Sequence, residues 1–174
     1  MRNHVICATI VLSVFAIAAQ AQQASKLYNP AIDMDGFLKV SRDAAKHRST
    51  RRLTEDQFIA MSKEPGVVIL DARSTEKFNE LHIVGAINLS FPDITIESLA
   101  ANLPNKKTKI LIYCNNNFEN APSAFAAKIA PASLNLSTYV SLYSYGYRNV
   151  YELGPLLDAK TTKIELVASE ATAK

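Results

Sequence analysis

Lys109-Ile110-Leu111-Ile112-Tyr113-Cys114 is an almost uninterrupted apolar run that ends at a cysteine. A second apolar run, Val67-Val68-Ile69-Leu70, lies upstream and is rich in β-branched residues. Continuous runs of this kind suit strands that are buried on both faces, as the strands of parallel sheets are. These two segments therefore indicate a central parallel β-sheet.

Helix signals surround these two runs. Thr54-Glu55-Asp56-Gln57 has the pattern of a capping box, which predicts that a helix begins there. Strands that alternate with helices predict an α/β fold in which helices cover both faces of a parallel sheet. Further helices are expected near residues 74–81, 95–103, 122–129 and 138–145, and further strands near 86–89 and 149–153.

The composition fits one globular domain and excludes several classes of protein. The chain has 174 residues, 48% of them hydrophobic and 20% charged, so it is neither collagen-like nor wholly disordered. The formal net charge of +3 is mild and dispersed, which argues against nucleic acid as a partner. Two Cys and three His are too few for a Cys/His zinc site or a disulfide scaffold. We therefore expect no metal and no cofactor.

The N-terminus has the three-part pattern of a signal peptide. A basic start, an apolar run over residues 5–19 and the triplet Ala19-Gln20-Ala21 predict that residues 1–21 are cleaved, with an uncleaved anchor as the alternative. The protein is thus expected to be exported, either periplasmic or secreted, and free of the membrane after cleavage. Cleavage would also remove Cys7, which leaves Cys114 as the single thiol.

The segments that flank the predicted sheet are polar. Residues 22–52 form a lead-in whose basic stretch, from Lys39 to Arg52, is either a site for an anionic partner or a solvated helix face. We favour the solvated face. Residues 159–174 are rich in Ala, Thr, Lys and Glu, and we expect a flexible tail there.

Cys114 lies where a parallel α/β sheet places its chemistry, at the carboxyl end of a strand. The loop after it is expected to lead into a helix that begins at Pro122. Loop amides and the positive end of that helix would favour a thiolate with an anion beside it. The alternative is that Cys114 is a small residue of the core.

Several segments follow one another along the chain: Leu70-Asp71-Ala72-Arg73, Phe78 with His82-Ile83, Gly85-Ala86-Ile87-Asn88, Ile112-Tyr113-Cys114, Ser123 to Ala127, and Tyr145 to Gly154. In sequence and order these segments resemble the rhodanese-like domain family, and we assign residues 53–158 to such a domain. The resemblance implies a catalytic Cys114 that takes sulfane sulfur from a small donor and holds it as a persulfide. A thiol or cyanide then accepts the sulfur, and the thiol is either a small molecule or a protein. The substrate-binding loop would be Asn115, Asn116, Asn117, Phe118, Glu119 and Asn120.

The active-site loop departs from the family pattern. The family commonly has Arg five positions after the cysteine, whereas this chain has Glu119, and its loop is longer and contains no basic residue. An inward carboxylate would repel thiosulfate, and an outward one would matter little. Residues 131–141 resemble an insertion that shapes the mouth of the site. We interpret His82 as structural and Asp71 with Arg73 as a pair that holds a turn.

Three functions are compatible with this pattern. The first is a sulfurtransferase that works through Cys114, and the second is a rhodanese-fold binding or regulatory module with little turnover. The third is a phosphatase, since related dual-specificity phosphatases have a longer cysteine loop. Phosphoryl transfer needs a cationic clamp, and no Arg or Lys lies between Cys114 and Lys128, so we rank this function last.

Overall fold

The computed structural model describes residues 29–169 of the chain. The chain divides into two compact units, Met1–Phe37 and Leu38–Lys174. In the described part of the first unit, the Asp33 carboxylate accepts from the Gly36 amide at 2.8 Å, at the start of helix α2 (Met34–Arg48). The predicted signal peptide lies outside the described residues.

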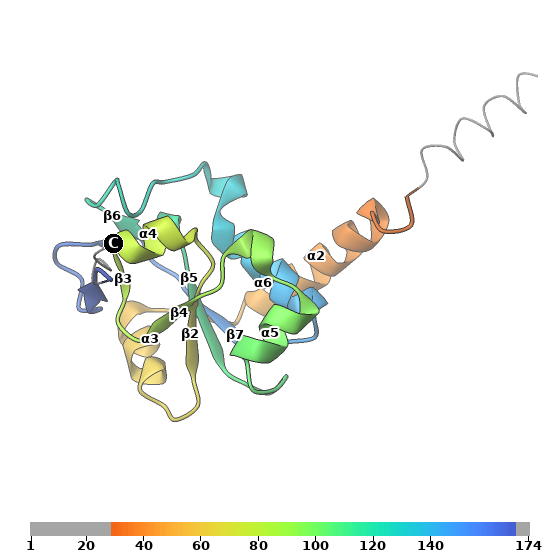
Figure 1. Cartoon of the computed structure of the whole chain (residues 1–174), viewed down its shortest axis with the longest axis horizontal. Helices are drawn as coiled ribbons and strands as arrows, with labels where there is room; N and C mark the ends of the chain where they lie inside the picture. Colours follow the sequence, from red (N-terminus) through yellow and green to blue (C-terminus); the bar gives the residue numbers. More distant parts are fainter. Residues whose placement is uncertain (1–28, 170–174) are drawn as a thin grey trace, which may run out of the picture. The chain divides into compact units, whose positions relative to one another are not determined.

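The second unit is built on a five-stranded parallel sheet in the order β1-β7-β5-β2-β4 (Figure 1). Strands β5 and β2 lie inside this order, as suits a strand that is apolar throughout (β5) and one that is apolar up to the buried Asp71 at its end (β2). This sheet confirms the fold class predicted from the two apolar runs. Its strands are β1 (Arg52–Leu53), β2 (Val68–Asp71), β4 (Ala86–Asn88), β5 (Ile110–Tyr113) and β7 (Val150–Leu153).

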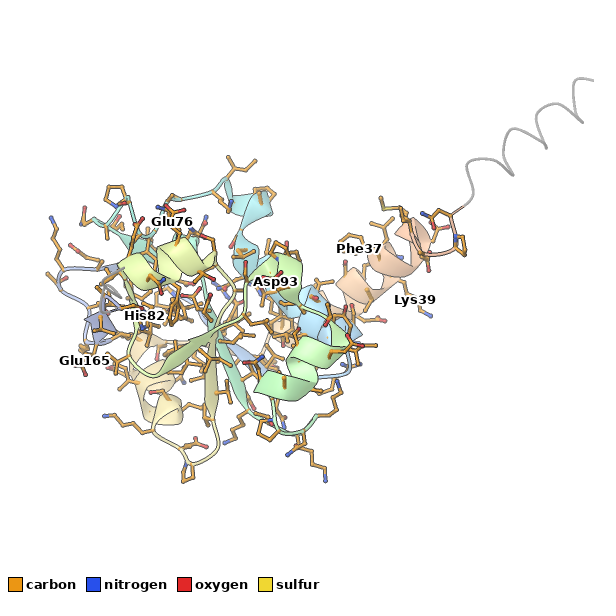
Figure 2. The ribbon with its side chains drawn as sticks, in the orientation of Figure 1. Phe37, Lys39, Glu76, His82, Asp93 and Glu165 are labelled. Atoms are coloured by element: carbon orange, nitrogen blue, oxygen red, sulfur yellow. The ribbon has the colours of Figure 1, made fainter. Side chains whose placement is uncertain are left out.

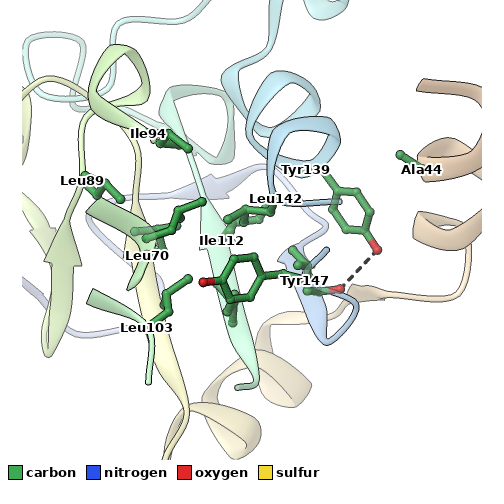
Figure 3. Packing of buried hydrophobic residues seen from close by; sticks show 12 residues of the cluster. Ala44, Leu70, Leu89, Ile94, Leu103, Ile112, Tyr139, Leu142 and Tyr147 are labelled. Carbon is green, nitrogen blue, oxygen red and sulfur yellow. Dashed lines mark hydrogen bonds between the residues drawn. The ribbon is translucent and has the colours of Figure 1, made fainter. Parts of the chain in front are cut away.

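Alternate side chains of the central strands point into two separate apolar clusters, one on each face of the sheet. Leu70, Ile110 and Ile112 join the cluster that contains Leu99 of α5 and Leu142 of α6 (Figure 3). The helices of the described unit are α3 (Glu55–Ser62), α4 (Thr75–Glu80), α5 (Ile96–Asn102) and α6 (Leu134–Ser144), with the 3₁₀ turns η1 (Phe91–Asp93), η2 (Asn115–Asn117) and η3 (Ala130–Ala132).

The opposite face carries the second cluster. Ile69, Leu111 and Tyr113 pack there with Phe58 of α3 and with Phe125 from the loop after Cys114. Every side chain of β5 packs in one of the two clusters, which explains why this strand contains no charged residue. Among the residues that the structure describes, no helix has the length and apolar character needed to span a membrane.

The helix predicted near residues 122–129 is absent, and the prediction is wrong for a definable reason. A helix would need the Lys128 amide to donate to the Ala124 carbonyl. Instead, Arg73 Nη1 donates to that carbonyl at 2.8 Å, and the Lys128 amide donates to Asn116 Oδ1 at 3.1 Å. The segment is therefore a loop that follows β6 (Phe118–Glu119), and α6 is the first α-helix after Cys114.

The predicted flexible tail is also wrong over its described part. Strand β9 (Leu166–Val167) pairs with β3 (His82–Ile83), and β8 (Leu157–Asp158) pairs with β6. Ile164 is buried in the second cluster, and the Lys163 amide donates to Glu55 Oε1 at 2.7 Å. Residues 159–169 thus belong to the domain, because they cover apolar surface and pair with the edge of β3.

The basic lead-in contributes to the domain as well. Ala44 of α2 is buried in the first cluster, and β1 pairs with β7 through the register Arg52↔Glu152. The preferred interpretation of this stretch as a solvated helix face holds for exposed residues such as Lys46. It is wrong for Arg48 and Arg52, which the sheet and helix α2 bring to the carboxyl end of β7.

Candidate functional site

Cys114 follows β5 directly, at the carboxyl edge of the sheet where ligands of parallel α/β folds bind. The residue is only 1% exposed, yet it belongs to neither apolar cluster. Its Sγ lies 3.5 Å from the hydroxyl of Ser133. The thiol is therefore a buried group that contacts a hydroxyl, which distinguishes it from the residues of the two apolar clusters.

Ser133 connects the thiol to the beginning of a helix. It is the N-cap of α6, but its hydroxyl makes no capping hydrogen bond and instead contacts Cys114. The partial positive charge at the start of α6 consequently lies beside the sulfur, where it favours a negative charge. The expected helix start beside the thiol is present, although α6 provides it in place of a helix at Pro122.

A cavity of about 300 Å³ opens beside Cys114. Side chains from four parts of the domain form its wall: the turn after β5, the start of α6, the end of β7 and the basic lead-in. The segment 131–141, which was expected to shape the mouth, contributes to this wall. The polar lining residues are Arg48, Arg52, Asn116, Asn117, Ser133, Asn135 and Glu152.

Asn117 organises the wall on the side of the sheet. Its Nδ2 donates to the carbonyls of Leu153 at 2.7 Å and Pro155 at 3.1 Å, so both amide hydrogens are used. Its Oδ1 accepts from the Cys114 amide at 2.9 Å and from Asn135 Nδ2 at 3.0 Å. Asn117 thus fixes both the turn that carries the thiol and the orientation of the Asn135 amide.

Two arginines bring positive charge to the cavity, whereas the loop after Cys114 contains no basic residue. Arg48 Nε donates to Glu152 Oε2 at 2.6 Å, and Arg52 Nε donates to Glu152 Oε1 at 3.0 Å. Glu152 is buried, with 2% of its side chain exposed, whereas 25% of Arg48 and 52% of Arg52 are exposed. Two cations share one anion, so this wall has a net positive charge.

The residues predicted for substrate binding separate into three groups. Asn116 and Asn117 line the cavity with Cys114, and Asn115 is buried without lining it. Phe118 packs in the second apolar cluster. Glu119 and Asn120 are exposed and line a neighbouring cavity of about 360 Å³ instead. Glu119 therefore corresponds to the outward alternative, in which its charge matters little to the thiol.

Asp71 and Arg73 form the structural pair that the sequence predicted. Arg73 donates to both carboxylate oxygens of Asp71, and Tyr113 donates to Asp71 Oδ2. Burial alone would lower the pKa of Arg73, but hydrogen bonds to Asp71 and its charge outweigh that effect and raise it. Burial, reinforced by the Asp71 charge, raises the pKa of Tyr113, so its hydroxyl stays protonated as a donor.

His82 has a structural position. Its Nδ1 lies 2.7 Å from the Phe78 carbonyl, and its ring stacks on Phe78 with centroids 3.7 Å apart. It follows α4, beside which Figure 2 labels it, and it is not part of the Cys114 cavity. Within residues 29–169 there is no group of three His, Cys, Asp or Glu side chains that could hold a metal ion.

Sequence reasoning missed five residues of this wall: Arg48, Arg52, Ser133, Asn135 and Glu152. The basic stretch was a usable signal for the first two, since it offered an anionic site as one interpretation. A lone acid at the end of a buried strand, Glu152, was a usable signal for their partner. Ser133 and Asn135 lie in the segment 131–141 that was expected to shape the mouth, but nothing in the sequence singled out these two residues within it.

Comparison with known proteins places this geometry in a family. The sequence model of the Rhodanese-like domain matches residues 54–153. The solution structure of the Rhodanese-like domain from the Alr3790 protein of Anabaena sp. is 23% identical, with 71% of this chain and 86% of that chain covered and a TM-score of 0.47. A crystal structure of the Alr3790 protein is 19% identical, with coverage of 68% and 93% and a TM-score of 0.45.

The BH2092 protein from Bacillus halodurans is 22% identical, with 66% of this chain and 75% of that chain covered and a TM-score of 0.43. No curated protein matches the chain. The family match begins at the capping box of α3 and ends with β7, so it includes every strand of the sheet except β1, together with the turn that carries Cys114. The chain belongs to the rhodanese-like domain family.

Proposed function

We propose that this rhodanese-like domain is a sulfurtransferase that carries sulfane sulfur as a persulfide on Cys114. The observation that supports it best is the place of the sulfur, at the end of β5 and on the wall of a cavity that also contains two arginines. The hydroxyl of Ser133 can donate to the sulfur when it is a thiolate. The start of α6 adds its positive end at the same point.

The loading step follows from this arrangement. The Cys114 thiolate attacks the outer sulfur of a donor such as thiosulfate, a new S–S bond forms, and sulfite leaves with the electron pair of the broken bond. No external oxidant or reductant is needed. The net positive wall made by Arg48 and Arg52 with Glu152 would stabilise the charge on the donor and on the departing sulfite.

A second candidate is a binding or regulatory module with little turnover. Its support is the almost complete burial of Cys114, since a donor must enter a small cavity to reach the sulfur. The shared Glu152 also lowers the charge that the two arginines can offer to an anion. In this function the cavity would bind a small ligand without sulfur transfer.

Mass measurement of the intact chain separates these functions. We expect incubation with thiosulfate or polysulfide to add one sulfur atom, and cyanide to remove it. A gain of sulfur that is lost in the Cys114→Ala variant and kept in a Cys7→Ser variant assigns the adduct to Cys114. Absence of any adduct with each donor would overturn the proposal in favour of a binding module, and release of phosphate from an aryl phosphate would overturn it in favour of a phosphatase.

A further inference from the structure

The Cys114 cavity contains a buried acceptor for which the domain provides no donor. Asn135 is 5% exposed and lines the cavity, and its Oδ1 has no hydrogen-bond partner among the described residues. Exchanging the oxygen and nitrogen positions of the Asn135 amide would not provide the missing partner. Asn117 presents its own oxygen to Asn135, so the nitrogen of Asn135 must face it and the oxygen remains free.

A buried acceptor without a partner is rare in folded proteins and calls for a donor from elsewhere. Two arginines with unused donors line the same cavity. Arg48 and Arg52 each use only part of their five N–H donors on Glu152 and Gly154. The wall therefore combines a site that accepts an N–H group with a site that binds an anion, and Cys114 lies on the same wall.

This combination matches the chemistry of a particular class of small molecule. We propose that the cavity selects an amino-acid thiol, such as cysteine, or its persulfide as the partner in sulfur transfer. The carboxylate would bind Arg48 and Arg52, the ammonium would donate to Asn135 Oδ1, and the sulfur would meet Cys114. A volume of about 300 Å³ is at the lower end for ligand cavities, which suits a molecule of this size.

This inference rests on the proposed function and specifies its substrate class. In the transfer, the acceptor thiolate attacks the outer sulfur of the Cys114 persulfide, and a new S–S bond forms. The S–S bond to Cys114 breaks, and the cysteine sulfur leaves with the electron pair as a thiolate. Donation by a small persulfide is the same reaction in reverse, so the cavity would serve both directions.

Three thiols, used as sulfur acceptors, test which groups of the ligand the cavity recognises. Cysteine has both the carboxylate and the amine, 3-mercaptopropionate has only the carboxylate, and cysteamine has only the amine. Protein loaded with polysulfide should transfer its sulfur to cysteine about tenfold faster than to either of the others, with rates normalised to the thiolate concentration. Rates that agree within about twofold would overturn the inference.

Two variants connect each group to its residue. Asn135→Ala should abolish the advantage of cysteine over 3-mercaptopropionate, because it removes the acceptor for the amine. Arg52→Gln should reduce the advantage of cysteine over cysteamine. A purely structural effect would slow all three acceptors equally, and that result would contradict the assigned contacts.

Binding of unreactive analogues keeps this test separate from the proposed function. S-methylcysteine, 3-(methylthio)propionate and 2-(methylthio)ethylamine cannot accept sulfur, so their affinities can be measured by NMR titration of the unmodified chain. We expect S-methylcysteine to bind about tenfold tighter than the other two. If the chain takes no sulfur but shows this preference, only the transferase function fails. If it takes sulfur but shows no preference, only the present inference fails.

Discussion

Two regions at the same edge of the sheet place arginine against carboxylate, and they differ in how completely their polar groups are satisfied. We call the first the closed region: Asp71, Arg73 and Tyr113. We call the second the open region: Arg48, Arg52, Cys114, Asn135 and Glu152. In the closed region every charged group is buried and bonded within the protein, whereas the residues that line the open region include arginines with unused donors and Asn135, whose buried Oδ1 has no partner among the described residues.

The difference teaches how to separate structure from chemistry in this fold. Arg73 donates to Asp71 and to the carbonyls of Leu81 and Ala124, and its side chain is only 1% exposed, so a ligand cannot reach it. Arg73 thereby connects β2, the turn after α4 and the loop after β6. The open region includes groups that the fold orients but does not saturate, which is the condition for binding a ligand.

We expect the largest effect, a loss of stability, from a substitution that breaks the closed region. Asp71→Asn removes the counter-ion of Arg73, whose side chain is only 1% exposed. A buried charge without its partner costs about 3–5 kcal/mol, so we expect the free energy of unfolding to fall by that amount. Urea denaturation followed by far-ultraviolet circular dichroism measures the change.

Arg52→Gln is the matched control for this prediction, because it also breaks an arginine–carboxylate pair. Half of the Arg52 side chain is exposed, and Glu152 keeps Arg48, so the expected loss is below about 1 kcal/mol. Equal losses in Asp71→Asn and Arg52→Gln would show that the two regions do not differ in the way described.

Much of the closed region was predictable from the sequence, because its residues are close to apolar runs whose periodicity is clear. Asp71 and Arg73 lie at the end of a buried apolar run and two positions apart, which places them together at a strand end. The fold class followed from the same runs. The prediction of a helix after Cys114 was wrong because Arg73 and Asn116 bind the Ala124 carbonyl and the Lys128 amide, which would have bonded to each other in that helix. These contacts join residues far apart in the sequence, so its local pattern does not reveal them.

The open region was only partly predictable. Cys114 was found from its position at the end of β5, and its immediate neighbours Asn116 and Asn117 were named with it. Arg48 and Arg52 come from a segment more than sixty residues upstream that reaches the cavity because β1 adds to the sheet edge beside β7. Sequence spacing carries no information about such an approach, whereas strand pairing decides it.

The next effect concerns the charge of the open region. Glu152→Gln leaves Arg48 and Arg52 without a shared anion, which raises the positive charge at the cavity wall. We expect loading of Cys114 by thiosulfate to become a few-fold faster at low ionic strength, because the wall attracts the dianion more strongly. Stability should fall by only about 1 kcal/mol, since water reaches both arginines. Mass measurement over time gives the rate.

Glu119→Gln is the matched control for that variant, because it removes the same charge from the loop after Cys114. Glu119 is exposed on β6 and lines the neighbouring cavity, so the loading rate should not change beyond the general effect of net charge. A Glu119→Gln variant that loads as fast as Glu152→Gln would mean that long-range charge, and not the cavity wall, controls the rate.

The smallest expected effect is a dependence of the free energy of unfolding on pH, which we assign to His47 of α2. Burial lowers the pKa of His47, with further lowering by the charges of Arg51 and Arg148, and its Nδ1 lies 2.8 Å from the Tyr139 hydroxyl. Since the unfolded chain binds the proton more readily, the free energy of unfolding should decrease as pH falls below about 6.5. It should level off below the lowered pKa of the folded state.

Urea unfolding between about pH 8 and pH 5 measures this slope, and His47→Gln should reduce it. Lys46→Gln changes an exposed charge on the same helix and should leave the slope as it is. Tyr113 of the closed region cannot contribute, because its pKa is raised further from neutral pH. An unchanged slope in His47→Gln would therefore assign the acid sensitivity to groups outside the contact between α2 and α6.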